Sequence, residues 1–134
     1  MSRVFLDTSA ILALLNPADR AHLRARKAFE DLAADGAPLV TTSLVLVETY
    51  ALLGRRLGLP AVKACRADLI PLADVAWVTP ETFEAGLDLL LSRRKRRLSL
   101  VDAVSFLVMR ERDIDLAFAF DPHFEEEGFT LVGS

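Results

Sequence analysis

The sequence predicts an α/β fold in which a mostly parallel sheet of about five strands carries helices on both faces. Two observations lead to this prediction. Short apolar runs alternate along the chain with longer amphipathic stretches, as strands alternate with helices in such folds. The chain has 134 residues, 52% of them hydrophobic, with no internal repeat or linker. We therefore expect one domain over residues 1–134, large enough to bury a core.

The predicted strands are short apolar runs bounded by polar residues, glycine or proline. The first directly follows the N-terminus, and the last is expected at an edge of the sheet. They span residues 3–6, 38–41, 75–78, 116–120 and 130–132.

The predicted helices lie between these runs, at residues 10–15, 18–34, 43–57, 60–70, 80–94 and 99–112. Asn16-Pro17 stops the first, Gly58 ends the third, and Pro80 occupies a first-turn position. In the second helix, the residues expected to face the core are Leu23, Ala28, Phe29 and Leu32.

The composition excludes several classes of protein. No apolar run approaches the roughly 18 residues of a membrane span. One cysteine, Cys65, excludes an internal disulfide and a multi-cysteine zinc site, and we expect it to act as a small hydrophobe on a helix. The N-terminal residues lack a signal-peptide pattern, so we expect a cytoplasmic protein.

Positive charge is concentrated in one segment of a chain whose net charge is −3. This basic run consists of Arg93, Arg94, Lys95, Arg96 and Arg97. Such a run attracts phosphate backbones, which makes these five residues candidates for RNA binding. It is equally consistent with a solvated helix end, where cations favour the helix dipole. The sequence leaves both interpretations open.

Four carboxylates are each the lone acid of an otherwise apolar segment. Burying a carboxylate alone costs several kcal/mol or forces it to take a proton. If the fold gathers the four, a divalent cation is the simplest way to offset their charge, and acid clusters holding Mg²⁺ or Mn²⁺ commonly act on phosphodiesters. The four acids are Asp7, Glu48, Asp102 and Asp121.

Each acid also has a structural explanation to be weighed, except Glu48. Asp7 and Asp121 stand where they would cap a following helix, and Asp102 lies in a predicted first helical turn. Glu48 lies past the first turn of its helix, so capping does not explain it. Asp115 is excluded from the site because it precedes the strand that Asp121 follows, roughly 15–20 Å away.

The segments around these acids resemble PIN domains. The segments that carry the resemblance are Phe5-Leu6-Asp7-Thr8-Ser9-Ala10, Val47-Glu48, Leu98-Ser99-Leu100-Val101-Asp102-Ala103 and Ala119-Phe120-Asp121-Pro122-His123-Phe124. The similarity spans essentially the whole chain, and the size is that of stand-alone VapC-type toxins. The family often has a further acid shortly after the fourth, where this chain has His123.

The resemblance implies a ribonuclease that depends on Mg²⁺ or Mn²⁺, held by Asp7, Glu48, Asp102 and Asp121. Thr8, Ser9 and Ser99 would orient these ligands or a phosphate, although capping is their default role. The resemblance also implies an RNA substrate, a cognate antitoxin and a homodimer. A nuclease for RNA processing outside a toxin pair, and a non-catalytic binding module, stay open as alternatives.

Three further expectations concern the pKa values of the acids and the exposure of three ring side chains. Without metal the clustered acids repel each other, so at least one should have a raised pKa. Tyr50 and Trp77 are expected in the core rather than stacked on bases, and His123 is expected to be an exposed loop residue.

Overall fold

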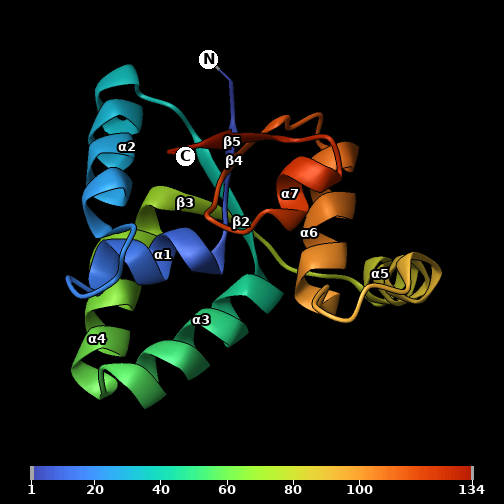
Figure 1. The fold of residues 1–134 in the computed structure, drawn as a ribbon, viewed down its shortest axis with the longest axis horizontal. Helices are drawn as coiled ribbons and strands as arrows, with labels where there is room; N and C mark the ends of the chain where they lie inside the picture. The colour runs from blue at the N-terminus through green and yellow to red at the C-terminus, as the bar shows by residue number, and fades with distance from the viewer. Residues whose placement is uncertain (1, 134) are drawn as a thin grey trace.

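In the computed structural model, which describes residues 2–133, five parallel strands form one sheet in the order β3-β2-β1-β4-β5 (Figure 1). The predicted fold class is therefore confirmed. The strands are β1 (Val4–Leu6), β2 (Leu39–Thr42), β3 (Ala73–Ala76), β4 (Leu116–Phe118) and β5 (Thr130–Val132). β5 lies at an edge, as predicted.

Helices cover both sides of the sheet, with α1 and α2 on one side and α6 on the other (Figure 1). The α-helices are α1 (Thr8–Leu15), α2 (His22–Asp35), α3 (Ser43–Arg56), α4 (Leu59–Ala64), α5 (Pro80–Arg93), α6 (Leu100–Glu111) and α7 (His123–Glu126). A π-helical turn, Cys65–Leu69, and a 3₁₀ turn, Ile70–Leu72, follow α4. The helix predicted over residues 60–70 is thus present but changes its winding midway.

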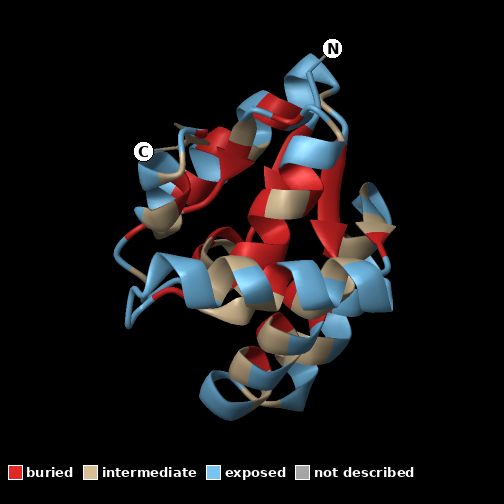
Figure 2. Cartoon of the chain, turned by 90° about the vertical axis from the view of Figure 1, so that its right-hand side faces the viewer, coloured by how far each residue is buried: buried red, intermediate tan, exposed pale blue. Residues whose placement is uncertain are grey.

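The core lies between the sheet and the inward faces of the helices, and the central strands are buried along their length (Figure 2). All residues of β1 and β2 are buried, as expected for strands covered on both faces. Phe106 and Phe124 pack edge to face with ring centroids 5.1 Å apart. Because Phe124 is fully buried, this contact fixes the short helix α7 that follows β4.

Two predicted strands differ from the observed ones, each for a local reason. β3 spans Ala73–Ala76 rather than residues 75–78, because the chain leaves the sheet where the Val78 N–H donates to Ser43 Oγ at 2.9 Å. β4 ends at Phe118 rather than residue 120, because the Phe120 N–H donates to Ser9 Oγ at 2.9 Å instead of to a strand. The second difference turns the chain toward the end of β1.

The prediction for the second helix was partly wrong. α2 begins at His22 because residues 18–21 form turns, in which the Asp19 carboxylate accepts from the Ala21 N–H at 2.8 Å. Ala28 and Leu32 are buried as predicted, but Leu23 is 76% exposed. Leu23 lies five residues before Ala28, which is about 140° around any α-helix, so it faces away from the core.

The expectation for the single cysteine was tested by its burial. Cys65 is a buried free cysteine, and burial raises its pKa to about 11, so it behaves as the expected small hydrophobe.

Within residues 2–133, the helices are all too short or too polar to cross a membrane.

Candidate active site

The site lies where the order of the strands reverses. The chain moves from β1 to β2 and β3 on one side, then crosses back to place β4 and β5 on the other. In parallel sheets, ligands bind outside the carboxyl ends of the strands at such a point. The Asp7 N–H donates to Phe118 O at 3.1 Å, which holds the ends of β1 and β4 together.

Asp7 caps α1 with one carboxylate oxygen and leaves the other free. Its Oδ2 accepts from the Ser9 backbone N–H at 3.1 Å and from Ser9 Oγ–H at 2.6 Å. Its Oδ1 is buried and has no hydrogen-bond partner among the described residues, although Asp7 is only 3% exposed. Capping and a ligand role are therefore compatible, because each uses a different oxygen. Ser9 also accepts from the Phe120 N–H and so joins α1 to the segment before Asp121.

Asp102 and Ser99 form a capping box at the start of α6. Ser99 Oγ accepts from the Asp102 N–H at 3.1 Å, and Asp102 Oδ2 accepts from the Ser99 N–H at 3.2 Å. This pairing fixes the carboxylate on the face of α6 that contributes to the pocket, and Asp102 is only 7% exposed. The predicted orienting role of Ser99 thus agrees with its contacts.

Glu48 reaches the same pocket from α3, where it is partly buried. Its position depends on how α3 lies against α1. Thr49 Oγ–H donates to Thr8 Oγ at 3.0 Å, and Thr8 Oγ–H lies 3.4 Å from Val45 O. Thr8 therefore acts by holding these two helices together. The sequence gave no reason to expect this role for Thr49, because a threonine next to an acid has no pattern that predicts a contact between helices.

Asp121 and His123 complete the group after β4. Asp121 Oδ1 accepts from the His123 backbone N–H at 2.9 Å. The imidazole Nδ1 of His123 lies 2.9 Å from Asp121 Oδ1 and 3.8 Å from Asp102 Oδ2. Its side chain is 16% exposed, so the expectation of an exposed loop histidine was wrong. The burial of Phe124 beside it draws His123 inward.

All four predicted acids line one pocket of about 290 Å³. The other lining residues come from the same elements and include the three predicted hydroxyl residues. They are Thr8, Ser9, Leu12, Leu52, Arg97 and Ser99. The tightest group of possible metal donors contains Asp102, Asp121 and His123, whose ligand atoms lie within 4.8 Å of one another. Asp7 and Glu48 flank this group.

Burial and mutual repulsion raise the pKa of two of these acids. Desolvation, followed by the charges of Asp102 and Asp121, raises the pKa of Asp7 to about 7, against the opposing effect of Ser9. Desolvation and the charge of Asp121 likewise raise the pKa of Asp102 to about 6. The predicted raised pKa is confirmed, but burial contributes more than repulsion. A divalent cation would favour the ionised form of both.

The basic run does not form a uniform surface. Arg93 Nε donates to Glu127 Oε1 at 2.7 Å, and Lys95 Nζ donates to Glu126 Oε1 at 3.1 Å. Arg97, by contrast, lines the acidic pocket. Arg94 caps α5 in a left-handed conformation, and Arg96 is exposed. Spacing alone gave no means of separating these roles, because the pairing acids, Glu126 and Glu127, lie about 30 residues away at the end of α7.

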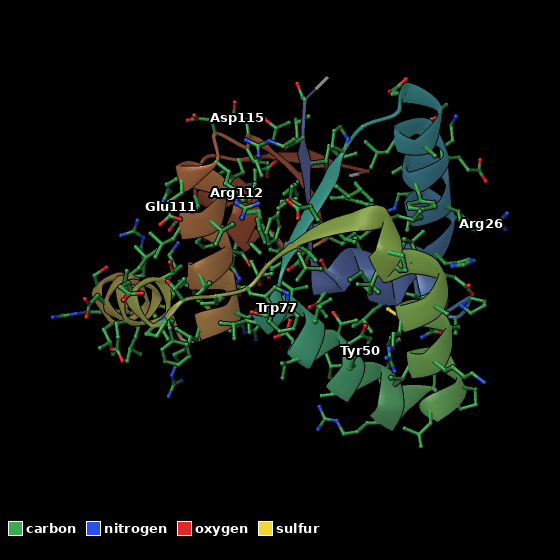
Figure 3. The ribbon with its side chains drawn as sticks, turned by 180° about the vertical axis from the view of Figure 1, so that it is seen from behind. Arg26, Tyr50, Trp77, Glu111, Arg112 and Asp115 are labelled. Atoms are coloured by element: carbon green, nitrogen blue, oxygen red, sulfur yellow. The ribbon has the colours of Figure 1, made fainter. Side chains whose placement is uncertain are left out.

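Two aromatic residues and one acid were predicted to lie outside the site. Tyr50 is partly buried against the core, as expected, but Trp77 is 76% exposed, so its assignment to the core was wrong. Figure 3 shows Trp77 beside α3, just where the chain leaves β3. Asp115 lies directly before β4, at the end of the strand opposite to Asp121, and does not line the acidic pocket, which agrees with its exclusion from the site. Figure 3 shows Asp115 near the top of the view, above Arg112 and Glu111.

Sequence comparison finds relatives that align over nearly the whole of this chain. A PIN-domain family model matches residues 4–129. The chain is 40% identical over 131 residues to the protein named 23S rRNA-specific endonuclease VapC20 of Mycobacterium tuberculosis, covering 96% of this chain and 97% of that protein.

Solved structures agree with this comparison. The crystal structure of Mycobacterium tuberculosis VapC20, described as a sarcin-ricin loop cleaving toxin, matches with a TM-score of 0.84 and 38% identity, over 95% of this chain and 96% of that one. FitAcB of Neisseria gonorrhoeae matches with a TM-score of 0.69 and 12% identity over 96% of both chains, which supports the fold alone. Since the family model and the 40% identical relatives each span nearly the whole chain, the protein belongs to the PIN-domain family.

Proposed function

We propose that this protein is a metal-dependent endoribonuclease, the toxin of a toxin–antitoxin pair, which hydrolyses RNA phosphodiesters in the acidic pocket. The observation that carries the proposal is the pocket itself. Four carboxylates from four separate segments converge there, and a buried oxygen of Asp7 has no hydrogen-bond partner within residues 2–133. The similarity to VapC20 over the whole chain supports the same conclusion.

The residues of the pocket fit Mg²⁺ or Mn²⁺. Carboxylate oxygens are the preferred ligands of both ions, and the unpartnered Oδ1 of Asp7 is a buried acceptor that a cation would satisfy. We assign Asp7, Glu48, Asp102 and Asp121 as the residues that would hold the ion. Once bound, such an ion lowers the pKa of a water molecule and offsets charge on the phosphate during hydrolysis.

The remaining polar residues of the pocket would hold these acids in place. Ser9 fixes Asp7 and the segment before Asp121, Ser99 fixes Asp102, and Thr8 with Thr49 fixes the spacing of α1 and α3. Each acts through a hydrogen bond to a neighbouring element, so we assign them positioning roles.

We propose Arg97 as the residue of the basic run that contacts the RNA backbone nearest the cleaved bond. It lines the pocket, whereas Arg93 is paired with Glu127 and Lys95 with Glu126 at the end of α7. Arg94 and Arg96 would add weaker, more distant attraction. We expect Arg97→Ala to slow cleavage by about 10-fold or more, as for loss of one charge-assisted phosphate contact. Arg96→Ala is the matched control, and equal effects of the two would contradict the special role of Arg97.

The relatives' names suggest a target. VapC20 is named for 23S rRNA and described as cleaving the sarcin-ricin loop, and we propose the same target class for this chain. A cognate antitoxin, a homodimer and a cytoplasmic location are part of this proposal, by analogy with VapC-type toxins.

The decisive experiment incubates the purified protein with intact ribosomes and with total RNA, in Mg²⁺ or Mn²⁺, beside EDTA and Asp7→Asn controls. A discrete 23S rRNA fragment that both controls abolish is the expected result. Cleavage of other RNA alone would point to a processing nuclease outside a toxin pair. Absence of any cleavage by a protein that still binds the metal would favour a non-catalytic binding module.

A further inference from the structure

The site contains a nitrogen donor among its carboxylates. His123 Nδ1 lies 2.9 Å from Asp121 Oδ1 and 3.8 Å from Asp102 Oδ2. Two neighbouring donors of a six-coordinate ion with bonds of about 2.1 Å lie about 3 Å apart, and opposite donors about 4.2 Å. The two measured separations fall close to or within this range. The three residues therefore have the spacing of a ligand set before any side chain moves.

Hydrogen bonding does not account for the imidazole. Asp121 Oδ1 already accepts from the backbone N–H of His123 at 2.9 Å. Although Nδ1 lies just as near, it lacks the angle of a hydrogen bond and is a buried nitrogen without a partner among the described residues. Buried polar atoms are nearly always satisfied, so an orphaned one calls for an explanation such as an ion. Asp7 Oδ1, in the same pocket, is a second such atom.

The backbone around His123 is well fixed. Phe124 is fully buried against Phe106, with ring centroids 5.1 Å apart, and against Phe129 at 6.4 Å. Pro122 precedes the histidine and restricts the entry to α7. A donor on such a support keeps its place without metal, which favours binding because little freedom is lost.

We propose that His123 is a nitrogen ligand of the divalent ion, so that the site combines carboxylates with one imidazole and prefers Mn²⁺ to Mg²⁺. This inference deepens the proposed function and rests on its metal site. Mg²⁺ strongly prefers oxygen ligands, whereas transition ions such as Mn²⁺ also accept imidazole. Members of the family that have an acid near this position would lack that preference.

The chain suits a direct spectroscopic test because it has two histidines, His22 and His123. His22 lies at the start of α2, where its Nδ1 contacts Ala13 O at 2.7 Å. Pulsed electron paramagnetic resonance of the Mn²⁺-loaded protein detects a directly bound nitrogen. We expect a ¹⁴N coupling that changes to that of ¹⁵N when only histidine is labelled, that His123→Ala abolishes, and that the control His22→Gln retains.

Metal affinity gives a second readout. The ratio of Mn²⁺ to Mg²⁺ affinity, measured by calorimetry, should fall about 10-fold in His123→Asp, which restores an oxygen ligand. Bound Mn²⁺ without histidine coupling, or an unchanged ratio in His123→Asp, would overturn the inference while leaving the nuclease intact. Histidine coupling in a protein that cuts no RNA would support the inference and remove the proposed activity.

Discussion

Asp7 and Glu127 are carboxylates whose side chains are both largely covered, but their neighbours have opposite charges. The side chain of Glu127 is 7% exposed and accepts from Arg93 at 2.7 Å and from Arg110 at 2.8 Å. These partners lower its pKa to about 2. Asp7 is 3% exposed, Ser9 is the one donor to its carboxylate in the part of the chain that the structure describes, and burial raises its pKa to about 7. Glu127, which stabilises the fold, is paired with two arginines. Asp7, which lies in the pocket, has other acids as neighbours and one carboxylate oxygen without a partner among the described residues.

The largest effect on stability is expected from Asp7→Asn. Because its native pKa is raised from 3.8 to about 7, Asp7 binds more protons in the native state, and metal-free stability falls as pH rises from about 4 to 7. At 1.36 kcal/mol per pKa unit, the loss above pH 7 is up to about 4 kcal/mol. Urea melts in EDTA should show Asp7→Asn gaining stability at pH 8 and losing this pH dependence. A variant less stable than wild type at pH 8 would contradict the comparison.

The same variant should separate stability from activity. We expect Asp7→Asn to reduce metal-dependent cleavage by about 100-fold or more, since loss of even an indirect contact to a metal commonly costs 10- to 100-fold. Cleavage assays at saturating Mn²⁺ measure this. A more stable but inactive protein is the combination that distinguishes a functional acid from a structural one.

Metal addition should stabilise the pocket and leave the Glu127 cluster unaffected. Mn²⁺ at 100 times its dissociation constant would add about 2.7 kcal/mol of stability, because it binds the folded state alone. Thermal melts with and without Mn²⁺ should show this gain in wild type and in Glu127→Gln, but not in Asp102→Asn. An equal gain in Asp102→Asn would place the ion elsewhere.

Glu127→Gln should destabilise the protein by about 1 to 2 kcal/mol, less than its pKa shift alone suggests, since solvent screens both arginines. Its native pKa is lowered to about 2, so the contribution is present above about pH 4.5 and is lost as pH falls through 2. Urea melts at pH 7 and pH 2.5 should therefore show a smaller difference between the two proteins in acid. A difference independent of pH would mean that packing, not charge, holds this cluster.

The smallest effect is expected from Ser99→Ala. It removes the hydroxyl that accepts from the Asp102 N–H at 3.1 Å and should cost about 1 kcal/mol. Because the hydroxyl also helps to fix Asp102, Mn²⁺ affinity should fall with it. Thr79→Ala, which removes the corresponding cap of α5 outside the pocket, is the control. It should lower stability without changing the affinity for metal.

The sequence predicted the elements of the fold because their signals are local. Strands read as short apolar runs, and Pro80, Gly58 and Asn16 mark helix ends. Leu23 was misassigned from the helical period, because it lies five residues before Ala28 and so about 140° around α2 from it. Trp77 was misassigned because a distant contact decides its exposure: the bond from the Val78 N–H to Ser43 Oγ turns the chain out of the sheet.

The four acids that line the pocket could be singled out from the sequence because a lone carboxylate in an apolar segment is conspicuous. His123 was misjudged because histidine suits both loops and interiors, and only the burial of Phe124 shows which applies. Likewise, the division of the basic run between ion pairs and pocket depends on Glu126 and Glu127, which are about 30 residues from the cations they contact.

The order of the strands has a consequence for synthesis of the chain. The donors gathered in the pocket come from residues 7, 48, 102, 121 and 123 of 134, and β4 must pair with β1 before the last two reach it. A nascent chain therefore cannot assemble the pocket until the segment that follows β4 has emerged from the ribosome. If the chain cuts ribosomal RNA, the growing chain has no finished pocket to direct at the ribosome that makes it until that segment has emerged.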